Sequence, residues 1–155
     1  RVLVSVVGTA DCTAEEARAA EAVGRAVAAR GAVLLTGGLG GVMAAASKGA
    51  HEAGGLVVGI LPTGRAEDAN PWVDVPLVTG LGDARNVIVA GSADAVIAVG
   101  GKLGTLTEIA FALKRGIPVV GLGTWALEAS RLDGPGVIRA GNPEDAVAKA
   151  FAARP

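Results

Sequence analysis

Two glycine-rich turns in the sequence have the composition of an anion-binding site. Residues 36–41 read Thr-Gly-Gly-Leu-Gly-Gly and residues 100–105 read Gly-Gly-Lys-Leu-Gly-Thr. Each turn follows a short apolar segment and precedes a segment with helical periodicity. Glycine lets the backbone approach a bound group closely, and the free N–H groups of a helix N-terminus attract phosphate. Glycines can also serve only tight turns and close packing, but two such turns in 155 residues favour ligand binding.

The second turn also carries polar side chains. Thr105 stands where it could cap a helix predicted over residues 105–115, and its hydroxyl could donate to a phosphate oxygen. Glu108 falls in the first turn of that helix, where the dipole stabilises a carboxylate. Glu108 therefore either stabilises the helix alone or stands beside a bound phosphate. In the second case it could contact a ribose hydroxyl, a water or developing positive charge.

Arg85 and Asn86 form a third polar group, at the start of a short helix predicted over about residues 83–90. The guanidinium of an arginine is a planar fork that suits bidentate recognition of phosphate. A solvated surface arginine is the alternative, since a cation is not favoured at the start of a helix.

Other types of site have weaker support. Met43 stands where the G-x-G-x-x-G fingerprint needs a small residue, so ordinary NAD binding is disfavoured, and no Walker A spacing precedes Lys48. His51 is the only histidine and Cys12 the only cysteine. No metal site is therefore expected.

Alternating strands and helices must position these residues. Apolar segments predict strands at residues 2–7, 33–35, 56–61, 75–78, 94–99, 117–121 and 137–139. Helical periodicity predicts helices at residues 14–30, 42–53, 83–90, 105–115 and 143–153. Thr13 and Glu16 have the spacing of a capping box, and Asn142 precedes the last helix as its cap.

The predicted strands are continuous apolar runs, which is typical of a parallel sheet covered by helices on both faces. We therefore predict a single doubly wound, Rossmann-like α/β domain over residues 1–155. Ligands of such sheets bind outside the carboxyl ends of the strands, and the first strand ends at Gly8 and Thr9. The candidate ligand-binding residues are Gly8, Thr9, Gly37, Gly38, Gly40, Gly41, Arg85, Asn86, Gly100, Gly101, Gly104, Thr105 and Glu108.

Composition excludes several partners. The 14 basic and 15 acidic residues give a net charge of −1 and form no basic stripe, so we expect no nucleic acid partner. No apolar run approaches the roughly 20 residues of a membrane span, and no signal peptide is evident, so we expect a cytoplasmic protein. Two Phe, two Trp and no Tyr leave little to stack on a base. The site should therefore bind phosphate tightly and show little selectivity for the rest of its ligand.

Four segments together resemble a known family. They are Thr36-Gly37-Gly38 with Gly41-Val42-Met43, residues 54–62, Ala84-Arg85-Asn86, and residues 100–108. The last is similar to the motif P-G-G-x-G-T-x-x-E. Over about residues 2–150 the chain resembles the LOG-like Rossmann family, often labelled lysine decarboxylase-like, and looks closest to the branch of the molybdenum cofactor carrier proteins.

The resemblance implies a homo-oligomer, a dimer or tetramer, that binds a small phosphorylated ligand at the glycine turns. In the carrier branch this ligand is a phosphorylated pterin, the molybdenum cofactor, and no further cofactor is required. In the hydrolase branch the family cleaves the N-glycosidic bond of nucleoside 5′-monophosphates, and Arg85 and Glu108 would take its catalytic roles.

The chain departs from the hydrolase motifs at several positions. Val99 replaces the motif proline, Lys102-Leu103 puts two residues where the motif has one, and Gly82-Asp83-Ala84-Arg85-Asn86 keeps only the arginine of M-H-x-R-K. These departures favour a binding protein for a pterin or a nucleotide monophosphate. A phosphoribohydrolase remains the alternative, and the resemblance does not imply a lysine decarboxylase.

Overall fold

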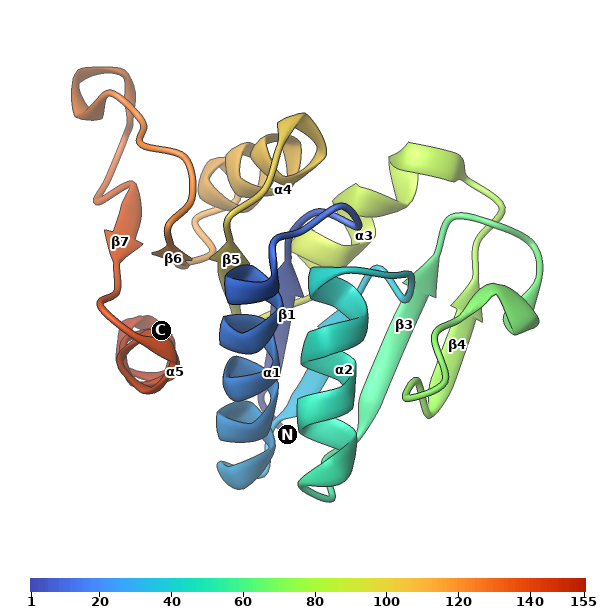
Figure 1. Ribbon diagram of the computed structural model, residues 1–155. Helices are drawn as coiled ribbons and strands as arrows, with labels where there is room; N and C mark the ends of the chain where they lie inside the picture. The colour runs from blue at the N-terminus through green and yellow to red at the C-terminus, as the bar shows by residue number, and fades with distance from the viewer.

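The computed structural model describes residues 1–155 and contains one seven-stranded, all-parallel sheet (Figure 1). The strands are β1 (Leu3–Val7), β2 (Val33–Thr36), β3 (Val57–Leu61), β4 (Val75–Val78), β5 (Ala95–Val99), β6 (Val119–Leu122) and β7 (Val137–Arg139). The α-helices are α1 (Ala14–Ala29), α2 (Val42–Glu52), α3 (Asn86–Gly91), α4 (Leu103–Lys114) and α5 (Pro143–Ala153). Short 3₁₀ helices cover Ala66–Asp68, Gly82–Arg85 and Ala129–Arg131.

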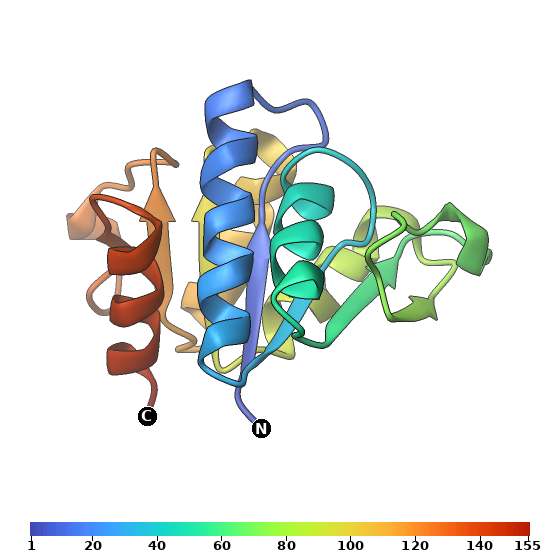
Figure 2. The same cartoon turned by 60° about the horizontal axis from the view of Figure 1, so that its bottom comes forward.

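The helices cover both faces of the sheet, as the continuous apolar strands predict. Helices α1, α2 and α5 lie side by side on one face (Figure 2), and α3 and α4 lie on the other (Figure 1). Two separate apolar clusters fill the two interfaces, with Val4 and Ile97 facing one and Val96 and Ala98 facing the other. The prediction of a doubly wound α/β fold is confirmed.

The order of the strands creates a crevice beside β1. The sheet runs β4-β3-β2-β1-β5-β6-β7, so the chain builds outward from β1 to β4 and then returns to the other side of β1 at β5. Val4 pairs with Leu34 of β2 on one side and with Ala95 of β5 on the other. The loops after β1 and β5 therefore diverge from a topological switch point, where ligands of such sheets bind.

Small residues bring α1 and α2 into backbone contact. A Cβ added at Gly24 of α1 would overlap the carbonyl oxygen of Ala46, and one added at Gly49 of α2 would overlap that of Glu21. The two glycines thus face each other's helix reciprocally. These two glycines therefore serve close helix packing rather than a ligand site.

The helix caps agree with the sequence in two cases and differ in one. The Thr13–Glu16 capping box is present, and the Asn142 side chain accepts a bond of 2.8 Å from the Asp145 amide. Helix α4, however, begins at Leu103 after an N-cap, Lys102, whose side chain makes no capping hydrogen bond. The predicted capping role of Thr105 is therefore wrong, because the residue lies inside the first turn.

The segment before α3 also differs from the prediction. Residues 82–85 form a 3₁₀ turn, and the α-helix begins only at Asn86.

None of the helices combines the length and the apolar character needed to cross a membrane.

Candidate functional site

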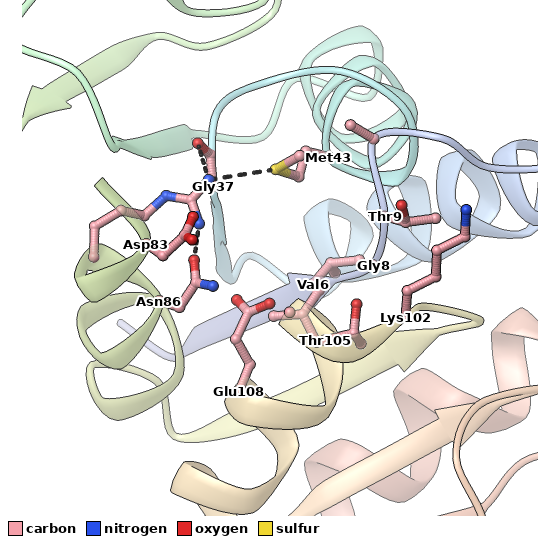
Figure 3. A pocket seen from close by; sticks show the side chains of 14 residues that line it. Val6, Gly8, Thr9, Gly37, Met43, Asp83, Asn86, Lys102, Thr105 and Glu108 are labelled. Atoms are coloured by element: carbon pink, nitrogen blue, oxygen red, sulfur yellow. Dashed lines mark hydrogen bonds between the residues drawn. The ribbon is translucent and has the colours of Figure 1, made fainter. Parts of the chain in front are cut away.

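A cavity of about 230 Å³ opens at the switch point, among the ends of β1 and β2 and the start of α4 (Figure 3). Of the predicted site residues, it brings together Gly8, Thr9, Gly37, Arg85, Asn86, Gly104, Thr105 and Glu108. Val6, Val7, Ala10, Met43, Asp83 and Lys102 complete its lining. The cavity therefore combines residues from the loops after β1, β2 and β5 with residues before and within α3.

Arg85 is a buried cation in the wall of this cavity, not a solvated surface residue. Its side chain is 8% exposed, Nη1 donates to Oδ1 of Asn86, and Nη2 lies 3.4 Å from the carbonyl oxygen of Gly37. Nε is the one fully buried side-chain polar atom without a hydrogen-bond partner. Burial lowers the pKa of the guanidinium below its usual range, while the charges of Glu108 and Asp83 oppose that shift.

Glu108 points into the cavity from α4 (Figure 3), and Arg85 lies near enough for its charge to act on the carboxyl group. The residue is 7% exposed, and no protein group bonds to its carboxyl oxygens. Burial raises the pKa of Glu108 to about 8, and the nearby charge of Arg85 only partly offsets this effect. At neutral pH the free protein therefore presents a largely neutral carboxyl group that can both donate and accept a hydrogen bond.

The first turn of α4 supplies donors to the same cavity. The backbone N–H groups of Leu103, Gly104 and Thr105 have no acceptor within the protein, as is usual at a helix N-terminus. Thr105 is 3% exposed and lines the cavity, so its hydroxyl faces the same space as these amides. Free amides at the positive end of a helix form a favourable site for an anion.

The first glycine turn contributes only Gly37 to the lining. Gly38 and Gly41 have positive φ angles of 78° and 60°, and a Cβ at Gly41 would overlap the carbonyl oxygens of Thr9 and Ala10. Gly40 faces open space. These three predicted ligand residues lie outside the cavity, because the turn packs against the loop after β1 and against Leu61.

Gly100 and Gly101 also lie outside the cavity lining. Gly100 has a φ of 54°, donates its N–H to Leu122, and sits against the carboxylate of Glu16. Gly101, with a φ of 101°, faces the side chain of Thr105. Both glycines shape the turn that brings α4 to the cavity, where Gly104 provides the close backbone approach.

Several lining residues are absent from the predicted set. Met43 places its sulfur 4.0 Å from Nη2 of Arg85, and Asp83 lies beside the same guanidinium. Asp83 belongs to the segment that carries Arg85, so its proximity in sequence was a usable signal. Lys102 at the mouth belongs to the second glycine turn. For Met43, the only signal in the sequence was that it stands where the G-x-G-x-x-G fingerprint needs a small residue.

The remaining chemical groups of the chain lie elsewhere. His51, at the end of α2, places Nδ1 3.0 Å from a carboxylate oxygen of Asp74, the residue directly before β4. Cys12 packs half-buried against the apolar cluster under α1. No group of three or more His, Cys, Asp or Glu side chains converges within the structure.

Comparison with known proteins supports the likeness of this chain and its fold to a family. The profile of the SLOG cluster4 family matches residues 1–147. An uncharacterized protein of Archaeoglobus fulgidus is 50% identical over 120 residues, which is 77% of this chain and 78% of that protein.

Solved structures of similar proteins agree. The molybdenum cofactor binding protein of Rippkaea orientalis superposes with a TM-score of 0.90 at 39% identity, covering 98% of this chain and 96% of that one. The Moco carrier protein of Chlamydomonas reinhardtii gives 0.88 at 40% identity, covering 99% and 97%. This chain belongs to the SLOG cluster4 family, with a LOG-like Rossmann fold near the molybdenum cofactor carrier branch.

Proposed function

We propose that this protein binds a phosphorylated pterin of the molybdenum cofactor type and carries it as cargo. The observation that carries the proposal is the cavity itself, in which the free amides of α4 meet two buried polar side chains, the cation Arg85 and the largely neutral carboxyl of Glu108. Its support from relatives is the likeness, over nearly the whole chain, to two proteins described as binding or carrying that cofactor.

The phosphate of the ligand would lie at the first turn of α4. There the amides of Leu103, Gly104 and Thr105 can donate to its oxygens, and the hydroxyls of Thr105 and Thr9 can add two further bonds. Gly104 has only the side-chain nitrogen of Asn86, at 3.9 Å, within 4 Å of an added Cβ. This open position gives the phosphate room to approach the backbone.

The ring system of the ligand would meet the polar groups deeper in the cavity. A pterin edge presents both N–H donors and N or O acceptors, and the neutral carboxyl of Glu108 can pair with either. The amide of Asn86 offers further polar contacts, while Arg85 supplies a positive potential from the wall. A volume of about 230 Å³ lies below the usual range of roughly 300–1,000 Å³ for whole-ligand pockets. The cavity would therefore hold one part of the ligand and leave the rest at its mouth.

Loading experiments test this proposal. The purified protein is incubated anaerobically with isolated molybdenum cofactor, desalted, and analysed for bound pterin by fluorescence and for bound molybdenum by mass spectrometry. We expect both to elute with the protein, close to one per cavity. A protein that emerges free of pterin and molybdenum would contradict the proposed cargo.

A nucleoside 5′-monophosphate phosphoribohydrolase is the second candidate. The observation that favours it is the pair formed by Arg85 and Glu108, because a largely protonated carboxyl can act as a general acid toward a departing base. Release of free base and ribose 5-phosphate from AMP, lost in Glu108→Ala, would support this activity. A failure of the wild-type protein to release base would exclude AMP hydrolysis as its function.

We also propose that the protein assembles as a homo-oligomer, a dimer or tetramer. The outer surface of α3 and α4 exposes Val87, Ile88 and Leu103 at 47%, 36% and 70%. A second copy would cover such an apolar surface. Light scattering coupled to size exclusion should give a multiple of the 15.1 kDa chain mass, and Leu103→Asp should lower that multiple. A monomeric wild-type protein would contradict this assembly.

A further inference from the structure

An ion pair lies at the edge of the cavity, with Lys102 in the lining and Asp11 outside it. Nζ of Lys102, at the start of α4, lies 3.1 Å from Oδ2 of Asp11, in the loop between β1 and α1. The two side chains are 68% and 90% exposed. An ion pair between two exposed side chains contributes little to stability, so either partner can exchange the other for a new one.

The backbone on both sides of this ion pair is fixed. The carbonyl oxygen of Lys102 accepts bonds of 3.0 Å from the indole N–H of Trp125 and from the amide of Leu106. The amide of Asp11 donates to the hydroxyl oxygen of Thr9 at 3.1 Å. A change of partner at Lys102 therefore requires only rotation of its flexible side chain and no movement of either loop.

Lys102 differs in this respect from the other cation of the cavity. Both terminal nitrogens of Arg85 already face protein acceptors, Asn86 and Gly37, and the side chain is enclosed by the wall. Lys102 lines the cavity next to the free amides of Leu103 and Gly104, with its ammonium group held only by Asp11. It is the cation best placed to follow an anion into the first turn of α4.

We propose that Lys102 binds the phosphate of the ligand and that Asp11 competes with that phosphate for the lysine. In the free protein the ion pair keeps the ammonium group at the mouth. When a phosphorylated ligand occupies the amides of α4, Lys102 leaves Asp11 and donates to a phosphate oxygen. This assignment rests on the proposed function and adds a residue that selects for the phosphorylated end of the ligand.

Competition predicts opposite effects for the two partners. Lys102→Met should weaken the binding of a pterin monophosphate about tenfold, because a charge-assisted hydrogen bond is lost. Asp11→Asn should strengthen it about two- to threefold, because the competitor for the lysine is gone. Lys102→Arg should restore most of the affinity, and added salt should reduce the difference between wild type and Lys102→Met.

Isothermal titration with the pterin monophosphate, the same pterin without phosphate, and inorganic phosphate tests the assignment. The unphosphorylated pterin should bind equally to wild type, Lys102→Met and Asp11→Asn. Lys48→Met is the matched control, because Lys48 forms a similar inter-helix pair with Glu21, at 3.3 Å, outside the cavity lining. It should leave all three affinities unchanged.

The outcomes separate the assignment from the function that it rests on. Wild-type protein that binds the phosphorylated pterin, with unchanged affinity in Lys102→Met or weakened affinity in Asp11→Asn, would overturn the assignment alone. Equal losses for the phosphorylated and unphosphorylated pterin in Lys102→Met would also overturn it. A wild-type protein that binds neither pterin monophosphate nor inorganic phosphate would overturn both the assignment and the proposed function.

Discussion

Gly37 and Arg85 meet at the wall of the cavity so closely that a Cβ atom added at Gly37 would lie 2.6 Å from Nη2 of Arg85. The same Cβ would lie 2.6 Å from the sulfur of Met43. The guanidinium of Arg85 therefore occupies space that is free only because residue 37 has no side chain. Gly37, directly after β2, thus determines the position of Arg85, directly before α3, relative to Glu108.

Gly37→Ala should displace Arg85 and weaken ligand binding. Gly37 does not have a positive φ, so the backbone accepts alanine and the effect comes from overpacking against the arginine. We expect a loss of about 1–3 kcal/mol in the free energy of unfolding, measured in urea, and a weaker titration with pterin monophosphate. Gly40→Ala, in the same turn but with nothing within 4 Å of its Cβ, should change neither. Equal effects of Gly37→Ala and Gly40→Ala would show that the missing side chain at residue 37 does not position Arg85.

Gly24→Ala tests the contact between α1 and α2. Helix propensity alone predicts a gain of about 1 kcal/mol for glycine to alanine inside a helix. The overlap of the new methyl group with the carbonyl oxygen of Ala46 predicts the opposite sign, a loss of about 2 kcal/mol. Gly104→Ala, in the first turn of α4 with open space around it, should not destabilise the protein. A stabilised Gly24→Ala variant would show that the two helices are not in backbone contact.

The pKa of Glu108 predicts how stability depends on pH. The pKa is raised to about 8 in the folded protein, whereas a glutamate carboxyl in the unfolded chain has its ordinary pKa of 4.5. As pH rises, the unfolded state therefore loses this proton before the folded state does. The contribution of Glu108 to the free energy of unfolding falls between about pH 4.5 and pH 8. Glu108→Gln, which resembles the neutral carboxyl, should remove this loss.

Urea denaturation of wild type and Glu108→Gln at several pH values measures the effect. The two proteins should have similar stability near pH 5, and the variant should be more stable by roughly 2–4 kcal/mol at pH 9. Binding of a pterin monophosphate to the wild type should weaken above pH 8, since Glu108 then adds negative charge beside the bound anion. A constant difference between the two proteins across this range would show that Glu108 titrates normally.

The lining of the cavity predicts broad selectivity. No aromatic side chain lines it, so a ring gains none of the roughly 1–3 kcal/mol per base that stacking can provide. AMP, GMP and a pterin monophosphate should bind with dissociation constants within about tenfold of each other, and the corresponding unphosphorylated compounds should bind more weakly. Competition titrations measure this series, and strict preference for one ring would count against the expectation.

The sequence was sufficient for the architecture and for the position of the site in it. Continuous apolar strands predicted a parallel sheet covered on both faces, and the caps at Thr13 and Asn142 marked two helix starts. These features are local, since each depends on residues within one turn or one strand. The alternation of elements placed Thr105 and Glu108 at the carboxyl end of the sheet, whereas the position of the switch point beside β1 came only from the strand order of the structure.

The positions and burial of individual side chains depended on contacts between residues that are distant in the sequence. The burial of Arg85 follows from Gly37, 48 residues away in the sequence, and no local pattern distinguishes it from a solvated arginine. The same limit applies to Gly38 and Gly41, because glycine serves backbone packing and ligand approach alike. Helix α4 begins two residues before Thr105 because its N-cap, Lys102, has no side-chain signature.

Filling the cavity at Gly104 shows whether the cavity is the binding site of the ligand. A Cβ added at residue 104 meets only Nδ2 of Asn86, at 3.9 Å, and Gly104 lines the cavity, so we expect Gly104→Leu to fill the cavity without disturbing the fold. We expect this variant to unfold at the same urea concentration as wild type or higher and yet to retain no molybdenum cofactor or pterin monophosphate. Gly40→Leu, outside the cavity, should bind both like the wild type. A folded Gly104→Leu protein that binds these ligands with wild-type affinity would show that the cavity is not the site.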